Sequence, residues 1–261
     1  MTVAAPSRAQ TPTASQRPLF TWRDGVLAGG FVIATRAARP FDKAAAVALQ
    51  RPERQRRWIL QEGSLIVRTI AVPGAVIIGT SMYAAGRLSH DERLAEVGLH
   101  GTEALFVGEA VGGVLKSFFG RARPYVDTTG PNPDDWQLLR GFHSGTEYRS
   151  FPSGHTVAAF AAAAAVSTET SVWWPTATYF AIGPVLYAGA AAVGVSRMYN
   201  NRHWATDVIT GAAIGTFAGN KVVRYHHRVN QDNRLDRWLL SVNVKPAPVS
   251  LRCVPLSFRF T

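Results

Sequence analysis

One histidine and one aspartate stand four residues apart in the segment SRMYNNRHWATD, residues 196–207. On one helix, His203 and Asp207 share a face, so the carboxylate can accept a hydrogen bond from the imidazole ring. Such a bond selects the tautomer and leaves the opposite ring nitrogen with a free lone pair, as a nucleophile or a metal ligand requires. Taken alone, this spacing also fits a solvated surface pair. Arg197 favours chemistry over that alternative, because its planar guanidinium matches phosphate oxygens.

A second candidate site is the segment PSGH, residues 152–155, at the start of an alanine-rich apolar run. The first N–H groups of a helix have no partner inside it, and together they form an anion site. Ser153 adds a hydroxyl donor, and Gly154 lets an anion approach closely. His155 would then stand where it can give a proton to a departing oxygen. The alternative is an ordinary helix start, in which Ser153 is only the N-cap.

Two cations flank a predicted helix end in the segment KSFFGRARP, residues 116–124. Lys116 ends the helix and Arg123 opens the following loop. Taken alone, such a pair is typical of a solvated helix end. A phosphoryl group in transfer spreads charge over several oxygens, and fixed cations stabilise that charge where water is excluded. Taken together, the three segments predict a phosphoryl-transfer site.

The three segments resemble the signature of the type 2 phosphatidic acid phosphatase superfamily. That superfamily also includes bacterial nonspecific acid phosphatases and vanadium-dependent haloperoxidases. Its pattern is Lys, six residues, Arg-Pro; then Pro-Ser-Gly-His; then Ser-Arg, five residues, His, three residues, Asp. The chain matches every fixed position between residues 116 and 207. The resemblance implies an all-α, six-helix bundle of the phosphatidic acid phosphatase and haloperoxidase type, embedded in a membrane, and a phosphatase activity.

The resemblance also implies a role for each residue of the signature. His203 would attack phosphorus to give a phosphohistidine, Asp207 would orient and polarise it, and His155 would protonate the leaving oxygen and then activate water. The remaining positions would hold the phosphate: Lys116, Arg123, Ser153, Gly154 and Arg197. Neither a metal nor another cofactor is expected, and vanadate should bind as a phosphate mimic.

Other charged residues receive no catalytic role from the sequence. We interpret the remaining histidines as structural or solvated, since none has a comparable partner: His90, His100, His143, His226 and His227. Glu103 and Glu109 interrupt an apolar helix, but Glu109 stands seven residues before Lys116, or about 10 Å along the axis, so direct pairing is not expected. Arg121 and Arg202, each beside a signature residue, would add positive potential to the site.

Six helices must position these groups. Hydrophobic patterning predicts them at 24–39, 64–86, 96–119, 155–170, 174–195 and 204–224. The fifth has no charged residue from Thr170 to Ser196. This uncharged stretch is long enough to cross the hydrocarbon core of a membrane, which takes about 20 helical residues. Gly211, Gly215 and Gly219 would let the sixth helix approach the alanine-rich fourth one closely. A water-soluble α-bundle is the alternative reading of the same pattern.

Composition limits the classes of binding partner, and the pattern along the chain divides it into three parts. The 261 residues carry a net charge of +11, which suits nucleic acid, a membrane surface or a phosphorylated substrate. With the signature in view, we expect a phosphorylated lipid or a small phosphate ester, a membrane, and no nucleic acid. We divide the chain into a disordered tail at 1–20, a helical phosphatase domain at 21–226 and a C-terminal extension at 227–261. In that extension, alternating apolar residues from Leu256 to Phe260 predict a short strand.

The expected location is a bacterial-type inner membrane with the active site on the periplasmic side. The substrate would be a lipid phosphate such as phosphatidic acid, phosphatidylglycerol phosphate or a polyprenyl diphosphate. Basic residues at both ends of the bundle give a mixed topological signal. Three alternatives remain open: a soluble periplasmic nonspecific acid phosphatase, a vanadium-dependent haloperoxidase, and a membrane scaffold with a dead site.

Overall fold

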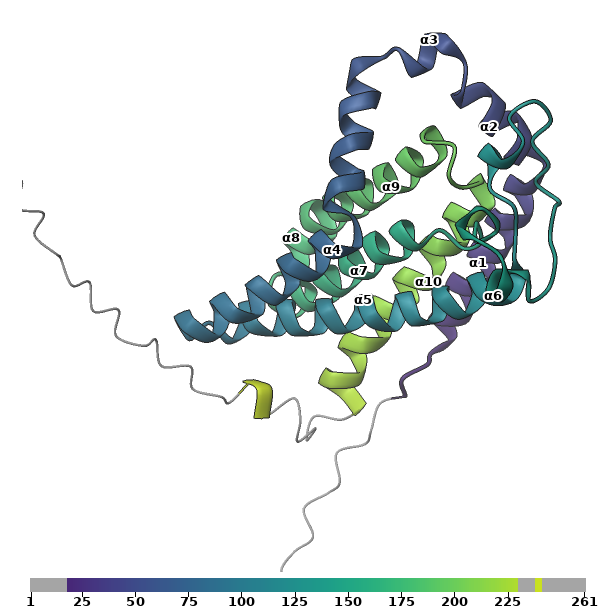
Figure 1. Ribbon diagram of the computed structural model, residues 1–261. Helices are drawn as coiled ribbons and strands as arrows, with labels where there is room; N and C mark the ends of the chain where they lie inside the picture. The colour runs from purple at the N-terminus through teal and green to yellow at the C-terminus, as the bar shows by residue number, and fades with distance from the viewer. Residues whose placement is uncertain (1–17, 230–237, 241–261) are drawn as a thin grey trace, which may run out of the picture.

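The protein is a bundle of α-helices. The computed structural model describes residues 18–229 and 238–240, and it contains no β-strand within these ranges. The helices that build the bundle are α1 (Trp22–Ala38), α4 (Trp58–Ser89), α5 (Glu92–Phe119), α7 (Gly154–Trp173), α9 (Gly183–Tyr199) and α10 (Ala205–Arg224) (Figure 1). Shorter helices connect them: α2 (Asp42–Leu49), α3 (Pro52–Gln55), α6 (Arg140–His143) and α8 (Pro175–Ala177).

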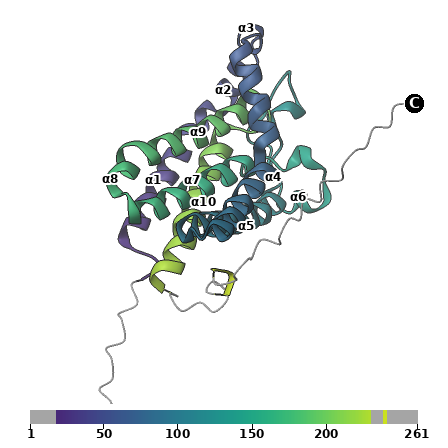
Figure 2. The ribbon, with the colours of Figure 1, turned by 90° about the vertical axis from the view of Figure 1, so that its left-hand side faces the viewer.

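The six predicted helices are all present, so the all-α architecture is confirmed. The fifth prediction corresponds to α8, a π turn over Thr178–Ile182 and α9, which together form one helical run, Pro175–Tyr199. The largest difference is α4, which begins six residues before the predicted start at 64 and contains Pro73. Both views of the ribbon show α4 rising beyond the bundle toward α3 (Figures 1 and 2). The predicted C-terminal strand, and the predicted tail up to residue 17, lie outside the described residues.

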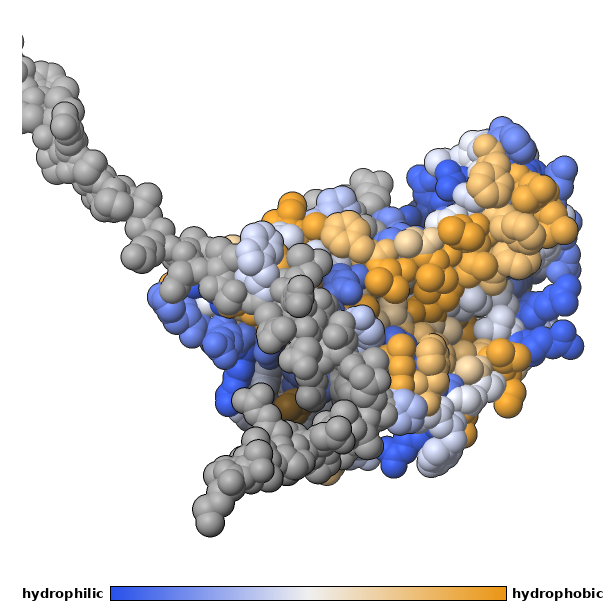
Figure 3. All heavy atoms as spheres, turned by 90° about the horizontal axis from the view of Figure 1, so that it is seen from below, coloured by the Kyte–Doolittle hydropathy of each residue, from blue (hydrophilic) through white to orange (hydrophobic). Residues whose placement is uncertain are grey.

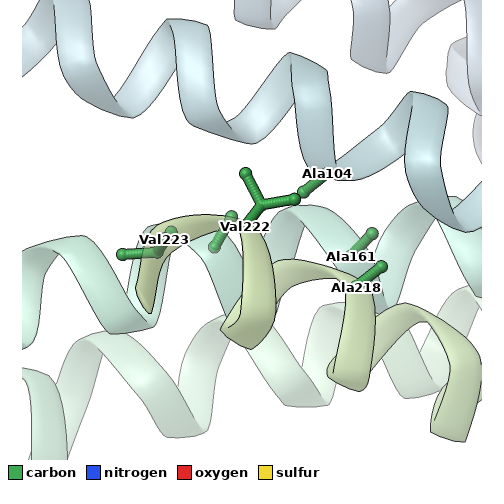
Figure 4. Packing of buried hydrophobic residues seen from close by; sticks show 6 residues of the cluster. Ala104, Ala161, Ala218, Val222 and Val223 are labelled. Atoms are coloured by element: carbon green, nitrogen blue, oxygen red, sulfur yellow. The ribbon is translucent and has the colours of Figure 1, made fainter. Parts of the chain in front are cut away.

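The core lies where α5, α7 and α10 meet, and it consists of small side chains. Ala104, Ala161 and Ala218 face one another from these three helices, with Val222 and Val223 closing the cluster (Figure 4). Since none of these side chains is large, the helix backbones come close together and dispersion contacts replace bulky interdigitation. The packing fixes how the ends of the three helices lie relative to one another.

The closest approach depends on glycine, as the sequence predicts. A β-carbon at Gly215 would lie 2.3 Å from the carbonyl oxygen of Val157 and 2.8 Å from the backbone nitrogen of Ala161. A β-carbon at Gly211 would lie 2.6 Å from the carbonyl oxygen of Ser153, the N-cap of α7, and one at Gly219 would lie 2.5 Å from that of Ala161. These three residues therefore let α10 lie against the backbone of α7.

Large apolar side chains are also exposed on the outside of the bundle. Figure 3 shows them gathered into a broad patch on the face seen from below. The run Pro175–Tyr199 is long and apolar enough to cross a membrane, with a mean hydropathy of 1.5 over its most apolar window. On this run Tyr179, Phe180 and Val185 are 75%, 74% and 69% exposed. An apolar surface of this kind is typical of a lipid-facing helix rather than of a helix in a water-soluble core.

Candidate active site

The predicted site residues come from four helix ends on one side of the bundle. Lys116 lies in the last turn of α5 and Arg197 in the last turn of α9. His155 lies in the first turn of α7 and Asp207 in the first turn of α10. Since α5 and α9 end where α7 and α10 begin, four segments distant in sequence meet at this end of the bundle (Figure 1).

His203 lies in the short connection before α10 and is held by the segment before α7. Its Nδ1 is 2.7 Å from the carbonyl oxygen of Ser150 but 3.7 Å from Oδ2 of Asp207. A carbonyl oxygen can only accept, so Nδ1 carries the proton and Nε2 keeps its lone pair. The expected lone pair is therefore present, but the direct hydrogen bond to Asp207 that we predicted is wrong. The backbone of Ser150 orients the ring instead.

The environment of His203 keeps its ring neutral. The side chain is 3% exposed, and this burial lowers the pKa of His203 well below its usual range. The positive charges of Arg123 and Lys116 act in the same direction, whereas Asp207 opposes them. A neutral ring is the form that can act as a nucleophile.

Asp207 is the centre of a buried ionic network. Its Oδ1 accepts from Nη1 of Arg121 at 2.5 Å, and its Oδ2 accepts from the hydroxyl of Ser150 at 2.5 Å and from the backbone nitrogen of Trp204 at 3.0 Å. The carboxylate thus holds Ser150, which orients His203, and Trp204, which follows His203 in the chain. Its effect on His203 passes mainly through these neighbours and through its charge.

Arg121 has a different role from the one that we expected from the sequence. Its guanidinium is fully enclosed and forms ion pairs with two carboxylates, Asp207 at 2.5 Å and Asp42 at 2.8 Å. Its charge is therefore balanced, and the prediction that it adds positive potential to the site is wrong. Arg202 is exposed and lies 4.8 Å over the ring of Tyr125.

Asp42, on α2, is a residue that sequence reasoning missed. Its Oδ1 accepts from the backbone nitrogen of Thr206 at 3.0 Å, and its Oδ2 accepts from the hydroxyl of Thr206 at 2.6 Å. Asp42 thereby caps the start of α10 from a distant segment. The only sequence signal is an acid in front of an alanine run, which by itself indicates no partner.

Cationic side chains surround the start of α7. The Lys116 ammonium donates to the carbonyl oxygen of Pro152. Arg123 donates to the carbonyl oxygens of Thr146 at 2.7 Å and of Arg149 and Arg202 at 3.4 Å. These bonds fix both cations beside the segment that carries PSGH.

Two further arginines bring positive charge to the same place. Arg197 is buried. Burial of His155, together with the charges of Arg197, Lys116 and Arg123, lowers the pKa of His155 to about 4. Arg149, which sequence reasoning missed, acts electrostatically on Lys116 and Arg123 and donates to Ser117 at 3.1 Å. A site with this much fixed positive charge suits a polyanionic group such as phosphate.

The start of α7 has donors and a glycine that would let an anion approach its backbone closely. Ser153 is the N-cap; its backbone nitrogen donates to the carbonyl oxygen of Asp207 at 3.0 Å, and its hydroxyl oxygen accepts from Thr156 at 2.9 Å. Its hydroxyl proton is thus the donor that it can offer an anion. A β-carbon at Gly154 would lie 3.0 Å from Nζ of Lys116 and 3.2 Å from Oε2 of Glu109. Glu109, to which we assigned no role, therefore reaches the same glycine as Lys116.

Three of the remaining histidines have carboxylate partners, so the prediction that they lack partners is wrong, whereas the structural interpretation of them stays a prediction. His100 and His227 both contact Glu169, and His226 contacts Glu103 at 2.7 Å. These residues lie at the opposite end of the bundle. By contrast, His90 forms the left-handed C-cap of α4 and His143 is exposed.

The described cavities do not coincide with this site. One of about 710 Å³ lies between the α4–α5 turn and the end of α7, and one of about 340 Å³ lies between α1 and α10. Neither is lined by a residue of the signature. The candidate active site is therefore identified by its side chains and their charges, not by the size of a cavity.

The chain is similar to known proteins in sequence and in fold. The PAP2 superfamily matches residues 99–231. A lipid A 1-phosphatase of Porphyromonas gingivalis is 44% identical over 78 residues, which are 29% of this chain and 16% of that protein. The chain therefore spans less than a fifth of that relative. The fold resembles the crystal structure of a transmembrane PAP2 type phosphatidylglycerolphosphate phosphatase from Bacillus subtilis, with a TM-score of 0.56 and 21% identity over 80% of this chain and 98% of that one.

Proposed function

The chain belongs to the PAP2 superfamily, and on that premise we propose that it is a membrane-embedded lipid phosphatase working through a phosphohistidine. One observation carries the proposal. His203 is buried and neutral, its Nδ1 proton is engaged by Ser150, and its other nitrogen is available beside fixed cations. A nucleophile prepared in this way, next to an anion site, suits attack on a phosphate.

The reaction has two steps. In the first, the bound phosphate dianion favours the protonated form of His155. Nε2 of His203 attacks phosphorus, the N–P bond forms, and the bond from phosphorus to the leaving oxygen breaks as the protonated His155 gives that oxygen its proton. In the second, His155 takes a proton from a water molecule, the resulting hydroxide attacks phosphorus, and the N–P bond breaks. Inorganic phosphate leaves, and both histidines return to their starting states.

The surrounding cations would stabilise the transferring group. Lys116, Arg123 and Arg197 are placed to share the charge that spreads over its equatorial oxygens. The unpaired N–H groups in the first turn of α7 and the hydroxyl of Ser153 would add oriented donors. Because these groups are fixed before substrate arrives, they need little reorganisation in the transition state.

A lipid phosphate is the proposed substrate class. The relative with 44% identity is named a lipid A 1-phosphatase, and the exposed apolar run Pro175–Tyr199 would keep the site at a lipid surface. Phosphatidic acid, phosphatidylglycerol phosphate and polyprenyl diphosphate belong to the same chemical class. Vanadate should compete with each of them as a phosphate mimic.

The test is a substrate panel with purified protein in detergent. Phosphate release is measured from a glycolipid 1-phosphate, the other lipid phosphates and a small soluble ester. We expect kcat/KM for at least one lipid to exceed that for the soluble ester by about tenfold or more. Hydrolysis of the soluble ester alone, or halide-dependent peroxide oxidation with vanadate in place of phosphate release, would overturn the substrate assignment.

The covalent step has its own test. With a substrate labelled on phosphorus, rapid denaturation at alkaline pH should trap labelled protein in the wild type and none in His203→Asn. The label should be lost in acid, as a phosphorus–nitrogen bond requires. Labelling that survives in His203→Asn would rule out this residue as the nucleophile.

We also propose that the active site faces the periplasmic side. The basic cluster that begins at Lys221, in the last turn of α10, and runs to Arg237 would then be cytoplasmic. This placement puts the arginines between 51 and 57 outside, so charge alone does not decide it. The test introduces single cysteines, His143→Cys or Arg93→Cys, in a Cys253→Ser background. An impermeant reagent added to intact cells should label the cysteine at 143, on the side of the candidate active site, and not the one at 93. Labelling at Arg93 alone would reverse the orientation.

A further inference from the structure

A second cluster of titratable side chains lies at the end of the bundle opposite to the candidate active site. His100 is on α5, Glu169 is on α7, and His227 is on the π turn that continues α10. Nδ1 of His100 contacts Oε1 of Glu169, and Nε2 of His227 lies 2.7 Å from Oε2 of Glu169. One ligand atom from each residue lies within 4.8 Å of the others.

The burial of this cluster makes its charge costly. The side chain of Glu169 is 0% exposed and that of His100 is 2% exposed. Every ion pair that the described residues give Glu169 is with a histidine. A buried carboxylate needs a compensating positive charge. That charge comes either from a proton on a histidine or from a bound cation.

The donor set is one that divalent transition metals prefer. Two imidazole nitrogens and one carboxylate oxygen match three-ligand zinc sites, which leave a position for water. We propose that His100, Glu169 and His227 bind a divalent metal ion of the zinc class. Two further residues support the arrangement. His226 stacks on His100, with ring centroids 4.3 Å apart and planes 9° apart, and is itself held by Glu103 at 2.7 Å.

The metal would replace the hydrogen bonds that now join these residues. Ligand atoms about 2.0–2.2 Å from a tetrahedral ion are about 3.3–3.6 Å apart, so the present spacing requires side-chain shifts of about 1 Å. Binding would release any proton held on the two coordinating nitrogens. His227 is 31% exposed, which gives the ion a route to the buried carboxylate.

Such an ion would join three helices at a point far from the phosphate chemistry. His100 precedes Lys116 by 16 residues on α5, or about 24 Å along the helix axis. The metal would therefore take no part in phosphoryl transfer. Its role would be to hold the ends of α5, α7 and the π turn after α10 together.

The test measures metal binding by untagged protein in detergent. Metal content after equilibrium dialysis against Zn²⁺ should approach one equivalent per chain, and Co²⁺ in its place should give visible d–d absorption. His227→Ala and Glu169→Gln should each weaken binding by about tenfold or more. His143→Ala, which removes an exposed histidine at the other end, should bind as the wild type does.

The outcomes separate the proposal from a purely hydrogen-bonded cluster. Absence of saturable binding, or equal affinity in the wild type and His227→Ala, would overturn it. If Glu169→Gln does not fold, X-ray absorption of the zinc-loaded wild type decides. Two nitrogen ligands and at least one oxygen ligand support the site, whereas a shell of oxygen alone or of a single nitrogen contradicts it.

Discussion

The two ends of α5, α7 and α10 carry opposite kinds of chemistry on the same scaffold. At one end, the candidate active site, cations surround a neutral histidine and the start of α7. At the other, a buried carboxylate is surrounded by histidines. Between them lies a core cluster of alanine and valine with no ionisable side chain, beside the glycines of α10. The comparison indicates that the small-residue core fixes the geometry, while each end supplies its own chemistry.

The largest expected effect separates the two ends by activity. His203→Ala should lower kcat by about 10³-fold or more, because it removes the proposed nucleophile. His227→Ala, at the opposite end of the same helices, should keep kcat within about threefold while it loses metal affinity. The measurement is phosphate release at saturating substrate, with folding checked by size-exclusion chromatography. Comparable losses of kcat in both variants would show that the ends do not act separately.

The next effect concerns the buried ionic network behind the candidate active site. Arg121→Met leaves the carboxylates of Asp42 and Asp207 without their shared cation, so it should lower the free energy of unfolding by about 3–5 kcal/mol. Arg39→Met breaks an exposed pair with Asp134, in which both side chains are about 60% exposed, and should cost about 1 kcal/mol or less. Denaturant unfolding in detergent compares the two variants. Equal losses would contradict the assignment of Arg121 to a buried structural centre.

A smaller effect tests the core that separates the two ends. Gly215→Ala places a methyl group against backbone atoms of α7 and should lower the free energy of unfolding by about 1–3 kcal/mol. Gly189→Ala, on α9, has nothing within 4 Å of the new methyl group and should be neutral or stabilising by up to about 1 kcal/mol. Thermal unfolding of both variants checks this difference. A neutral Gly215→Ala would mean that α7 and α10 are not held by this contact.

The smallest effect is a dependence of stability on pH. Because the folded protein lowers the pKa of His203, the unfolded chain binds more protons at this residue below a pH of about 6.5. The free energy of unfolding should therefore fall with pH below that value, by up to about 1.4 kcal/mol per pH unit from this group. His203→Asn should show a shallower decline between pH 7.5 and 5.5, while His143→Ala keeps the wild-type slope. An unchanged slope in His203→Asn would indicate a normal pKa for the ring.

The helices and the signature residues of the candidate site could be predicted from the sequence, because both depend on local patterns. Periodic apolar residues mark α5, α7 and α10, and the spacing of Lys116, His155 and His203 marks one end of them. The partners that complete this end could not be predicted in the same way. Ser150 stands 53 residues before His203, and Asp42 stands 164 residues before Thr206. Such contacts depend on how the helices pack, which no local spacing records.

The opposite end illustrates the same limit more strongly. His100 and Glu169 are 69 residues apart, and Glu169 and His227 are 58 apart. No motif joins them, so each histidine read alone looked solvated or structural. Only the side-by-side packing of three helices brings them together.

The ion pair between Asp42 and Arg121 bears on where this protein can be cut. The segment that matches the superfamily begins at residue 99, so it contains Arg121 but not its partner on α2. A shortened chain starting there would lack the carboxylate that accepts from Nη2 of Arg121 and from the backbone nitrogen of Thr206 at the start of α10. We therefore expect a stable shortened chain to begin before α2, upstream of the segment that matches the superfamily.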